Sequence, residues 1–535
     1  MAAPKSVVVL GGGISGLSTA YYLHKFCSQL KTRVPLPKIV VVESSSHLGG
    51  WLKTCTFDDG VRHELGPKTL RVATNSGYNA LSLVGDLGLS GEVVGTSGKS
   101  VVSQKRFIVA NDELVQLPNK VQDLLFKRKP FTKRLISYVI QDLRTPVIDL
   151  EAIGRDISVY DYVQRRLGTE IADYFIDPLC RGITAGNSKK LSVLSVFPDM
   201  VRGEQESGAI IAGAITNAQK TNVMKSLYDS PLITEAQTKR WSTYTFNDGM
   251  QALPNRLCDY MMSLDDKSIE IYNDSTVKKI DFDPTTRSTT ISISTPEDNN
   301  VELEASHVFS AIPARNLASV LSHRFGDLSE SLNDITSVHM AVINLEFKGK
   351  LMPDSSGFGF LVPSRENSNI LGIVYDSCVS PQFNANKDIT RLTVMMGGEW
   401  FEEIFGTNDV DNVDKNLVLN YAVDAVRKYL KIGDKPYRHI VSIHKNCIPQ
   451  YYLGHSLRLA KIDELVKKHS LNMTLVGASY QGFSVPDCIY YSKLAAESYA
   501  QNFRRQNKLL ANDTEINDSH SNNNNESLKV NQLSQ

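Results

Sequence analysis

The residues with the clearest chemical meaning lie near the start of the chain. Gly11-Gly12-Gly13-Ile14-Ser15-Gly16 fits the pattern G-x-G-x-x-G. In this pattern the first glycine permits a tight turn, the second lets backbone N–H groups approach a pyrophosphate, and the third lets a helix pack closely on a strand. Glu43 follows at the end of the next apolar run, where a carboxylate can accept both hydroxyls of a ribose. The pattern therefore predicts a dinucleotide site; the alternative is a glycine-rich turn that binds nothing.

These residues need a strand, a helix and a second strand to position them. Residues 6–10 and 38–43 are short β-branched runs that suit strands buried on both faces, and residues 17–26 suit a helix between them. A parallel pair joined in this way should have a right-handed crossover. A similar arrangement closes the chain, with a strand at 473–476, a turn at 477–482 and a helix at 485–500. Nucleotide-type β/α structure is thus predicted at both ends.

The rest of the chain is predicted to contain both helices and strands. Helices are expected at 156–180, 207–228, 417–430 and 462–469, and strands at 269–311, 338–347 and 391–396. Residues 119–144 combine large apolar side chains with many lysines and arginines, which suits either an element at a membrane surface or a packed pair of amphipathic helices. Residues 506–535 are rich in Asn and Ser and are predicted to form a disordered tail.

Composition excludes several classes of protein. The 535 residues exceed what one core usually organises, so two or three domains are expected, and the formal net charge of zero gives no reason to expect nucleic acid. The seven cysteines form no CxxC pair, so we predict reduced thiols, mostly buried, with neither a disulfide framework nor a metal site. We expect neither a secretory signal nor a transmembrane helix, because Ser6 to Leu23, the longest early uncharged run, contains the glycine loop.

The segment after Glu43 is similar to that of the amine-oxidase-like flavoproteins, with Gly49-Gly50-Trp51 in place and His47 where Arg is common. Other segments, together spanning most of residues 5–505, resemble those of the oxygen-dependent protoporphyrinogen oxidases, and the narrowest are 180–187, 448–455 and 477–489. Further matching segments are 64–71, 357–363 and 371–377.

The resemblance implies a fold that is α/β plus α+β. A Rossmann-like FAD-binding domain of the amine-oxidase and p-hydroxybenzoate-hydroxylase type would accompany a mixed-sheet substrate domain and a helical, membrane-associated domain. The expected boundaries are 1–75, 240–312 and 440–505 for the FAD-binding domain, 76–120 and 313–439 for the substrate domain, and 121–239 for the helical domain.

The resemblance also implies one non-covalent FAD per chain. The expected cofactor-binding residues would contact FAD along its length, from the pyrophosphate and ribose to the flavin. Among them, Lys68 stands where relatives often have Arg. A helix beginning at Val485 would place its positive dipole end toward the reduced flavin. The full set is Gly11, Gly12, Gly13, Ile14, Ser15, Gly16, Glu43, Ser44, Trp51, Gly66, Pro67, Lys68, Thr69, Val277, Ala478, Phe483, Ser484 and Val485.

The implied reaction is the oxidation of protoporphyrinogen IX to protoporphyrin IX, the penultimate step of haem biosynthesis, with three O2 consumed and three H2O2 released. Arg106 would pair with a propionate, the carbonyl of Gly182 would accept a pyrrole N–H, and Phe358, Leu361 and Met395 would line an apolar pocket. Electron-rich pyrroles assist hydride loss, so we assign no catalytic acid or base. His63, His444 and His455 are therefore predicted to be structural.

The family's eukaryotic members imply a peripheral place on the mitochondrial inner membrane, a homodimer, and contact with neighbouring haem-pathway enzymes. Two alternatives stay open from the sequence. One is another flavin enzyme of this fold, such as an amine oxidase or a desaturase. The other is a non-catalytic binding protein like the GDP-dissociation inhibitors, whose glycine loop is eroded, whereas Gly11, Gly13 and Gly16 are intact here.

Overall fold

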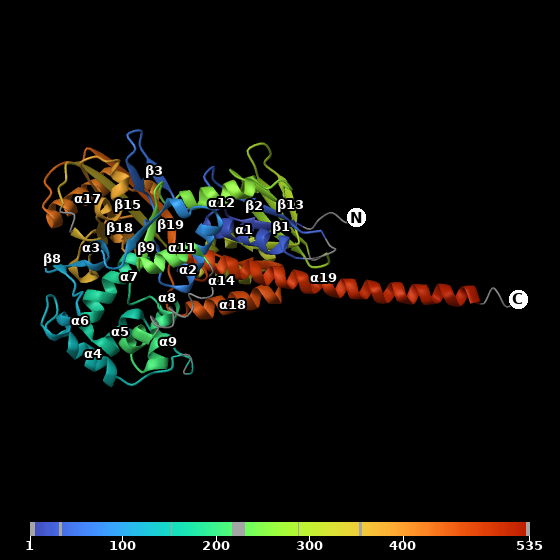
Figure 1. The fold of residues 1–535 in the computed structure, drawn as a ribbon, viewed down its shortest axis with the longest axis horizontal. Helices are drawn as coiled ribbons and strands as arrows, with labels where there is room; N and C mark the ends of the chain where they lie inside the picture. Colours follow the sequence, from blue (N-terminus) through green and yellow to red (C-terminus); the bar gives the residue numbers. More distant parts are fainter. Residues whose placement is uncertain are drawn as a thin grey trace.

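A computed structural model describes residues 6–30, 35–150, 152, 154–216, 230–286, 288–352 and 356–530, with the side chains of residues 121 and 508–530 left aside. It contains one parallel sheet, one large mixed sheet and a group of helices, which occupy three separate parts of the molecule (Figure 1).

The parallel sheet forms where the β-branched runs were predicted. Its strand order is β10-β2-β1-β14-β20, with bounds Ile269–Tyr272, Lys38–Val42, Ser6–Leu10, His307–Ser310 and Met473–Leu475. Side chains of β1 alternate between two cores: Val7 and Val9 face one, and Val8 and Leu10 face the other. Since both faces are covered, the strands need the continuous apolar pattern that the sequence shows.

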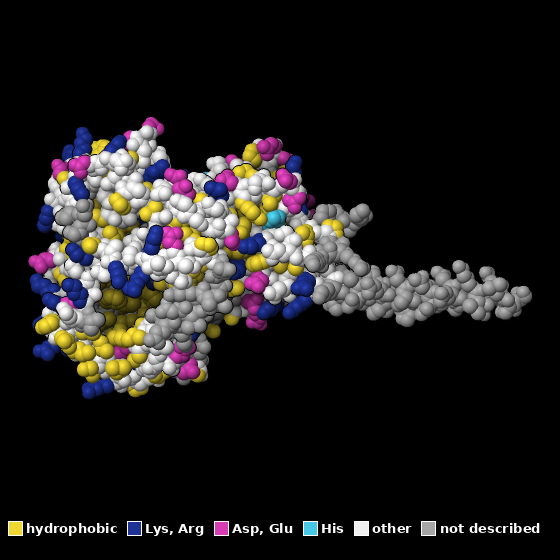
Figure 2. Space-filling model, viewed as in Figure 1, with side chains coloured by type: hydrophobic (Ala, Val, Ile, Leu, Met, Phe, Trp, Pro, Cys, Tyr) yellow, Lys and Arg dark blue, Asp and Glu magenta, His cyan; other side chains and the backbone are white. Residues whose placement is uncertain are grey.

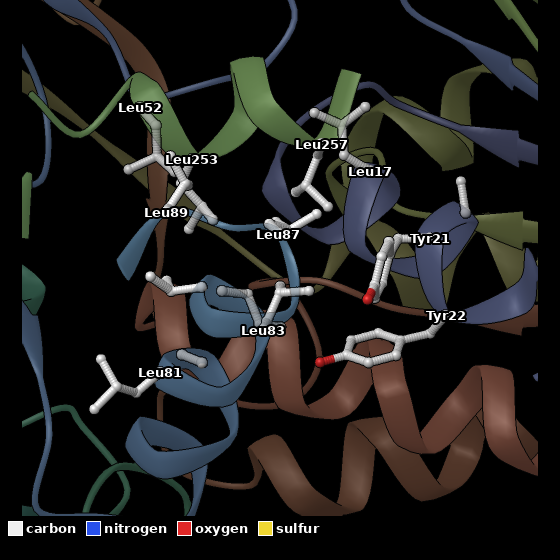
Figure 3. Close-up of a cluster of buried hydrophobic side chains, with 14 of the residues drawn as sticks. Leu17, Tyr21, Tyr22, Leu52, Leu81, Leu83, Leu87, Leu89, Leu253 and Leu257 are labelled. Carbon is white, nitrogen blue, oxygen red and sulfur yellow. The ribbon is translucent and has the colours of Figure 1, made fainter. Parts of the chain in front are cut away.

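The first core joins the sheet to helices drawn from distant parts of the chain (Figure 3). Leu17 and Tyr21 of α1 (Ile14–Ser28) meet Leu83 of α2 (Asn75–Asp86) and Leu257 of α12 (Ala252–Met262). Helix α11 (Pro231–Thr238) adds Leu232 to the same core. A small sheet nearby consists of β5 (Leu70–Arg71), β9 (Trp241–Phe246) and β6 (Val93–Ser97). Helix α2 therefore packs with the nucleotide-binding part, although its residues were predicted to open the substrate domain.

The second core covers the opposite face of the parallel sheet. It receives Ile280 and Ile291 from a three-stranded antiparallel sheet, and apolar side chains from three helices. The strands are β11 (Thr276–Asp283), β12 (Ser288–Ser294) and β13 (Val301–Ala305), and the helices are α13 (Ala314–Val320), α14 (Gly326–Asn333) and α18 (His455–Lys468). Residues 314–333 thus also pack with the nucleotide-binding part, although they were predicted to belong to the substrate domain.

The large sheet has seven strands in the order β19-β15-β18-β17-β16-β7-β8. Their bounds are Arg438–Pro449, Ser337–Lys348, Ile389–Gly398, Gly372–Val374, Gly359–Leu361, Phe107–Ala110 and Glu113–Gln116. Helix α17 (Lys415–Leu430) covers one face with Val418, Ala422 and Val426. Residues 440–449 pair with β15 and belong to this sheet, so the predicted third FAD-binding segment begins too early.

The third part is helical, as predicted. It contains α4 (Leu135–Arg144), α5 (Val159–Leu167), α6 (Thr169–Ile171), a π-helical turn η3 (Ala172–Ile176), α7 (Asp177–Thr184), α8 (Val193–Val196) and α9 (Pro198–Ser207). Residues 119–144 form only the short 3-10 turn η2 (Val121–Leu125) and α4, and the predicted helix at 207–228 is described as far as residue 216. Gly168 separates α5 from α6 with a φ of 86°, which favours glycine.

Helix α19 runs over Val485–Val530, so the backbone of residues 506–530 is helical (Figure 1). The disordered tail predicted for residues 506–535 stays a prediction, and residues 531–535 lie outside the described part. Composition alone suggested disorder, but no glycine or proline follows Pro486, so no residue there is incompatible with helical backbone.

The described residues also show the state of the cysteines and the apolarity of the helices. All seven cysteines are free, and Cys27, Cys180, Cys258 and Cys488 are buried. Within the described ranges, no helix has the length and apolarity needed to span a membrane, and no group of His, Cys, Asp and Glu side chains has the arrangement of a metal site.

Candidate active site

The glycine loop lies between β1 and α1, where the sequence placed it. Gly11 has a φ of 97°, and a Cβ on Gly16 would lie 1.8 Å from the Gly11 carbonyl oxygen, so both positions require glycine. Helix α1 has no side-chain cap and no acidic residue in its first turn. A Cβ on Gly13 would meet no atom closer than 3.9 Å. The helix start therefore offers N–H groups and room to an anion, which fits a pyrophosphate.

Glu43 leaves β2 beside this loop. Its Oε2 accepts a hydrogen bond from Gly12 N at 2.7 Å, and its Oε1 accepts bonds from Ser45 N and Oγ at 2.9 and 2.8 Å. Ser44 is exposed next to the carboxylate, and Val277 lies half-buried on β11. The chain thus holds the carboxylate at the loop, where a ribose bound across β2 would reach it.

The loop after Glu43 folds back over the glycines. Gly49 N donates to Gly12 O at 2.8 Å, and a Cβ on Gly49 would lie 2.8 Å from Pro254, which explains this glycine. Gly50 has a φ of 59°, and a Cβ there would lie 3.2 Å from Gly13 Cα. Trp51 is 46% exposed, with its ring 5.2 Å from that of His444. Burial, and then Lys53, lower the pKa of His47, so this residue does not supply the positive charge of the usual arginine at neutral pH.

Lys68 lies in a largely buried junction with the large sheet. Its Nζ lies 3.0 Å from Asp376 Oδ1 and donates to Thr393 Oγ1 at 2.9 Å. Burial would raise the pKa of Asp376, but Lys68 and Arg391 beside it bring it below its ordinary value. Burial raises the pKa of the neighbouring Glu64 to about 7. Lys68 therefore ties the segment Gly66-Pro67-Lys68-Thr69 to the large sheet, a contact that the sequence did not predict.

The start of α19 lies beside the start of α1. Ser492 Oγ donates to Ser15 O at 2.9 Å, which joins α19 to the first turn of α1. Ser484 accepts a hydrogen bond from Asp487 N at 3.3 Å and so caps α19 before Val485. Phe483 lies 5.6 Å from the ring of Tyr451, whose hydroxyl donates to Ala478 O. Both predicted cofactor segments thus meet at two adjacent helix N-termini.

The predicted substrate residues lie along the large sheet and α7. A Cβ on Gly182 would lie 2.6 Å from Leu361 Cδ2, and Met395 pairs with Gly372 next to the strand of Leu361. Arg106 is exposed, with its guanidinium 4.8 Å from the ring centre of Phe358 and one N–H on Val102 O at 2.7 Å. The structure therefore gathers Gly182, Leu361 and Met395, and places Arg106 with Phe358.

The histidines have structural contacts. His444 Nε2 lies 2.8 Å from Leu65 O, His455 stacks on Tyr451 with ring centres 4.0 Å apart, and His63 lies 3.3 Å from Glu346. Burial lowers the pKa of all three, to about 4 for His455. These contacts support the prediction that none of them is a catalytic base.

Two features were missed by sequence reasoning. One is the junction formed by Asp376, Thr393 and Lys68; the other is Arg181, which is 3% exposed and lies over the ring of Trp400. Asp376 and Arg181 both fall in segments that resemble the family, at 371–377 and 180–187. A charged residue inside an otherwise apolar, family-like segment was the signal that could have identified them.

Comparison with known proteins agrees with this geometry. Residues 14–498 match the family described as flavin containing amine oxidoreductase. The chain is 38% identical over 493 residues to the protoporphyrinogen oxidase of Bos taurus and 37% identical over 495 residues to that of Homo sapiens, each covering 92% of this chain and 98% of the relative. A crystal structure from Exiguobacterium, provisionally assigned as a protoporphyrinogen oxidase, has a TM-score of 0.71 at 22% identity and covers 94% of this chain and 100% of its own; it supports the fold alone.

Proposed function

Because this chain belongs to the protoporphyrinogen oxidases within the flavin-containing amine oxidoreductases, we propose that it oxidises protoporphyrinogen IX to protoporphyrin IX, the penultimate step of haem biosynthesis, with one non-covalent FAD, three O2 consumed and three H2O2 released. One structural observation supports the proposal independently of family membership. The glycine loop, Glu43 and the start of α19 fit a dinucleotide, and an apolar wall with an exposed arginine lies on the neighbouring sheet.

The glycine loop, Glu43 and the start of α19 would hold FAD, and the bound cofactor would supply hydride acceptance and reoxidation by O2. The residues of this chain would position the macrocycle for that chemistry. The Arg106 fork would donate two parallel hydrogen bonds to a propionate while its plane rests on Phe358. The carbonyl of Gly182 would accept a pyrrole N–H, and the apolar side chains of Leu361 and Met395 would exclude water.

Absorbance spectroscopy of the purified protein, followed by anaerobic addition of protoporphyrinogen IX, tests this function. We expect flavin bands that bleach, with porphyrin fluorescence that develops as they do. Flavin bands that stay oxidised would contradict the proposed substrate. A protein without flavin bands would favour a non-catalytic binding protein of the same fold.

The role of Arg106 is tested by Arg106→Ala. Loss of a charge-assisted pair is worth roughly 1.5–3 kcal/mol, so KM for protoporphyrinogen should rise about 10- to 100-fold while flavin content stays constant. Arg427→Ala is a matched control, because Arg427 is a half-exposed arginine on α17 that pairs only locally with Asp424 at 2.8 Å. An unchanged KM for the Arg106 variant would remove this residue from the site.

The helical part is the proposed membrane-contacting surface. Phe126, Leu143 and Phe175 are 56%, 61% and 49% exposed, and exposed basic residues such as Lys127 and Arg134 lie among them. Figure 2 shows hydrophobic side chains gathered over the region of α4 and α6, with Lys and Arg at the edges. This combination suits shallow insertion beside anionic headgroups. Location on the mitochondrial inner membrane, a homodimer, and contact with neighbouring haem-pathway enzymes complete the proposal.

Sedimentation with anionic lipid vesicles tests the surface. The double substitution Phe126→Ser and Leu143→Ser should reduce the bound fraction several-fold, since about 0.8 kcal/mol is lost for each CH2 removed from the bilayer. Met262→Ser is the control, because Met262 is 71% exposed on α12, in the nucleotide-binding part. Equal binding by all variants would favour a surface that faces water, and light scattering of the same samples measures the oligomeric state.

A further inference from the structure

Arg181 is a buried cation with few partners among the residues that the structure describes. It lies on α7, is 3% exposed, and makes one long hydrogen bond, from Nη2 to Ile370 O at 3.4 Å. Its Nε has no hydrogen-bond partner among the described residues. The guanidinium carbon lies 3.9 Å from the centre of the Trp400 ring. A buried charge in such surroundings is unfavourable unless a ligand completes its coordination.

Two carboxylates influence the charge of Arg181, but neither satisfies its hydrogen-bonding groups. Asp177 and Glu403 act on the charge electrostatically, but burial is the larger influence and lowers the pKa of Arg181 to about 10. Asp177 is already engaged with Ser188 Oγ, Ser364 N and Ser364 Oγ at 2.9, 2.7 and 3.0 Å, and Glu403 is exposed. The guanidinium remains protonated at neutral pH and retains hydrogen-bonding capacity for an anion.

Arg181 also borders the predicted substrate wall. The residue after it is Gly182, whose missing Cβ faces Leu361. Trp400, on which Arg181 stacks, packs against the same small apolar cluster as Met395. Over the region of α7, Figure 2 shows a hollow with a hydrophobic floor and with Lys and Arg side chains along one edge.

We propose that Arg181 binds a carboxylate of the tetrapyrrole, as a second anion-binding residue in addition to the exposed Arg106. The inference rests on the proposed oxidation of protoporphyrinogen. The stack on Trp400 holds the guanidinium plane in place, so that its fork can meet a carboxylate with little loss of side-chain freedom.

Kinetics of Arg181→Met with two substrates test this. For protoporphyrinogen IX we expect KM to rise about 10- to 100-fold with kcat changed far less, the range of one charge-assisted hydrogen-bonded pair. For the dimethyl ester, which lacks both charges, the substitution should leave KM within about twofold, because an ester forms no charge-assisted pair. Arg181→Lys should restore part of the loss for the free acid, since it keeps the charge without the fork.

Arg365→Met is the matched control, because Arg365 also stacks on an aromatic ring, that of Tyr174 at 4.7 Å, but is exposed and paired with Asp173. It should leave both KM values unchanged. Equal effects of Arg181→Met on acid and ester would overturn the proposal and make Arg181 a packing residue. Titration of the variants with the product protoporphyrin IX, followed by fluorescence, should show the same loss of affinity. A wild-type enzyme that oxidises neither substrate would instead refute the proposed function.

Discussion

Two arginines of the helical part are equally buried and have opposite surroundings. Arg166 of α5 is 0% exposed and donates to Asp142 Oδ1 at 2.6 Å, Glu204 Oε1 at 2.5 Å, and the carbonyl oxygens of Asp142 and Gly208, both at 2.7 Å. Arg181 of α7 makes one hydrogen bond within the described part of the chain, to Ile370 O at 3.4 Å. Burial alone therefore does not distinguish a structural cation from one that awaits a ligand, whereas the hydrogen-bond partners do.

The difference reflects what each arginine joins. Asp142 and Glu204 bring α4 and α9 onto α5, and Asp142 also accepts Ile210 N and Ile211 N, so the Arg166 cluster closes the helical part on itself. Arg181 instead lies between the helical part and the large sheet, where its partners are an aromatic face and one carbonyl. The first cluster stabilises the fold, and the second leaves an anion site open.

The largest effect is expected for Arg166→Met. It removes the shared cation and leaves two buried carboxylates without it, which should lower the free energy of unfolding by about 3–5 kcal/mol. Denaturant unfolding followed by circular dichroism measures this loss. A loss below about 1 kcal/mol would mean that the cluster is not structural, and would break the comparison.

A pH-dependent effect of similar size is expected for Glu64, in the junction near Lys68. Burial raises its folded pKa to about 7 from an ordinary value of 4.5, so the folded state holds the proton more tightly. Its contribution to stability is present below pH 4.5 and is lost as the pH rises to about 7, by roughly 3 kcal/mol in total. Glu64→Gln should remove this pH dependence. Parallel stability curves for the two proteins between these pH values would contradict the assignment.

A smaller loss is expected for Arg165→Met. Arg165 donates to Glu204 at 2.8 Å and to Pro146 O at 2.8 Å, and its side chain is 23% exposed. Glu204 keeps its contacts with Arg166 and Tyr162, so the free energy of unfolding should fall by only about 1 kcal/mol. Thermal unfolding of the Arg165→Met and Arg166→Met variants, measured in parallel, gives the ratio of their two losses of stability. Equal losses of unfolding free energy in the two variants would show that Glu204 needs both arginines to be stabilised.

The smallest effect on stability is expected for Arg181→Met. Replacing a poorly paired buried ion by an apolar side chain of similar size should change the free energy of unfolding by less than about 1 kcal/mol, in either direction. The same unfolding experiment measures it, with flavin content checked first. A loss of unfolding free energy as large as that of Arg166→Met would mean that Arg181 is a structural arginine. It would then argue against a role for Arg181 in binding a ligand.

Local pattern was enough to predict much of the fold. The buried strands at 6–10, 38–43 and 473–476, the glycine loop and the helices at 156–180 are all present, because hydrophobic period and turn chemistry act over a few residues. The disordered tail, which was predicted from composition, stays a prediction. The boundaries at 76, 313 and 440 differ from the packing because α2, α13 and β19 join cores or sheets formed by distant segments.

The sequence by itself was enough to predict where a dinucleotide would bind, from the glycine pattern at Gly11 and Gly16 and from Glu43 after a buried strand, and the backbone at both glycines agrees with that prediction. Only the tertiary structure decided which charges meet. Lys68 pairs with Asp376, and Arg181 stacks on Trp400, across separations in sequence that carry no periodic signal. Whether a buried charge is satisfied depends on partners supplied by other elements, and that is a property of the packed chain.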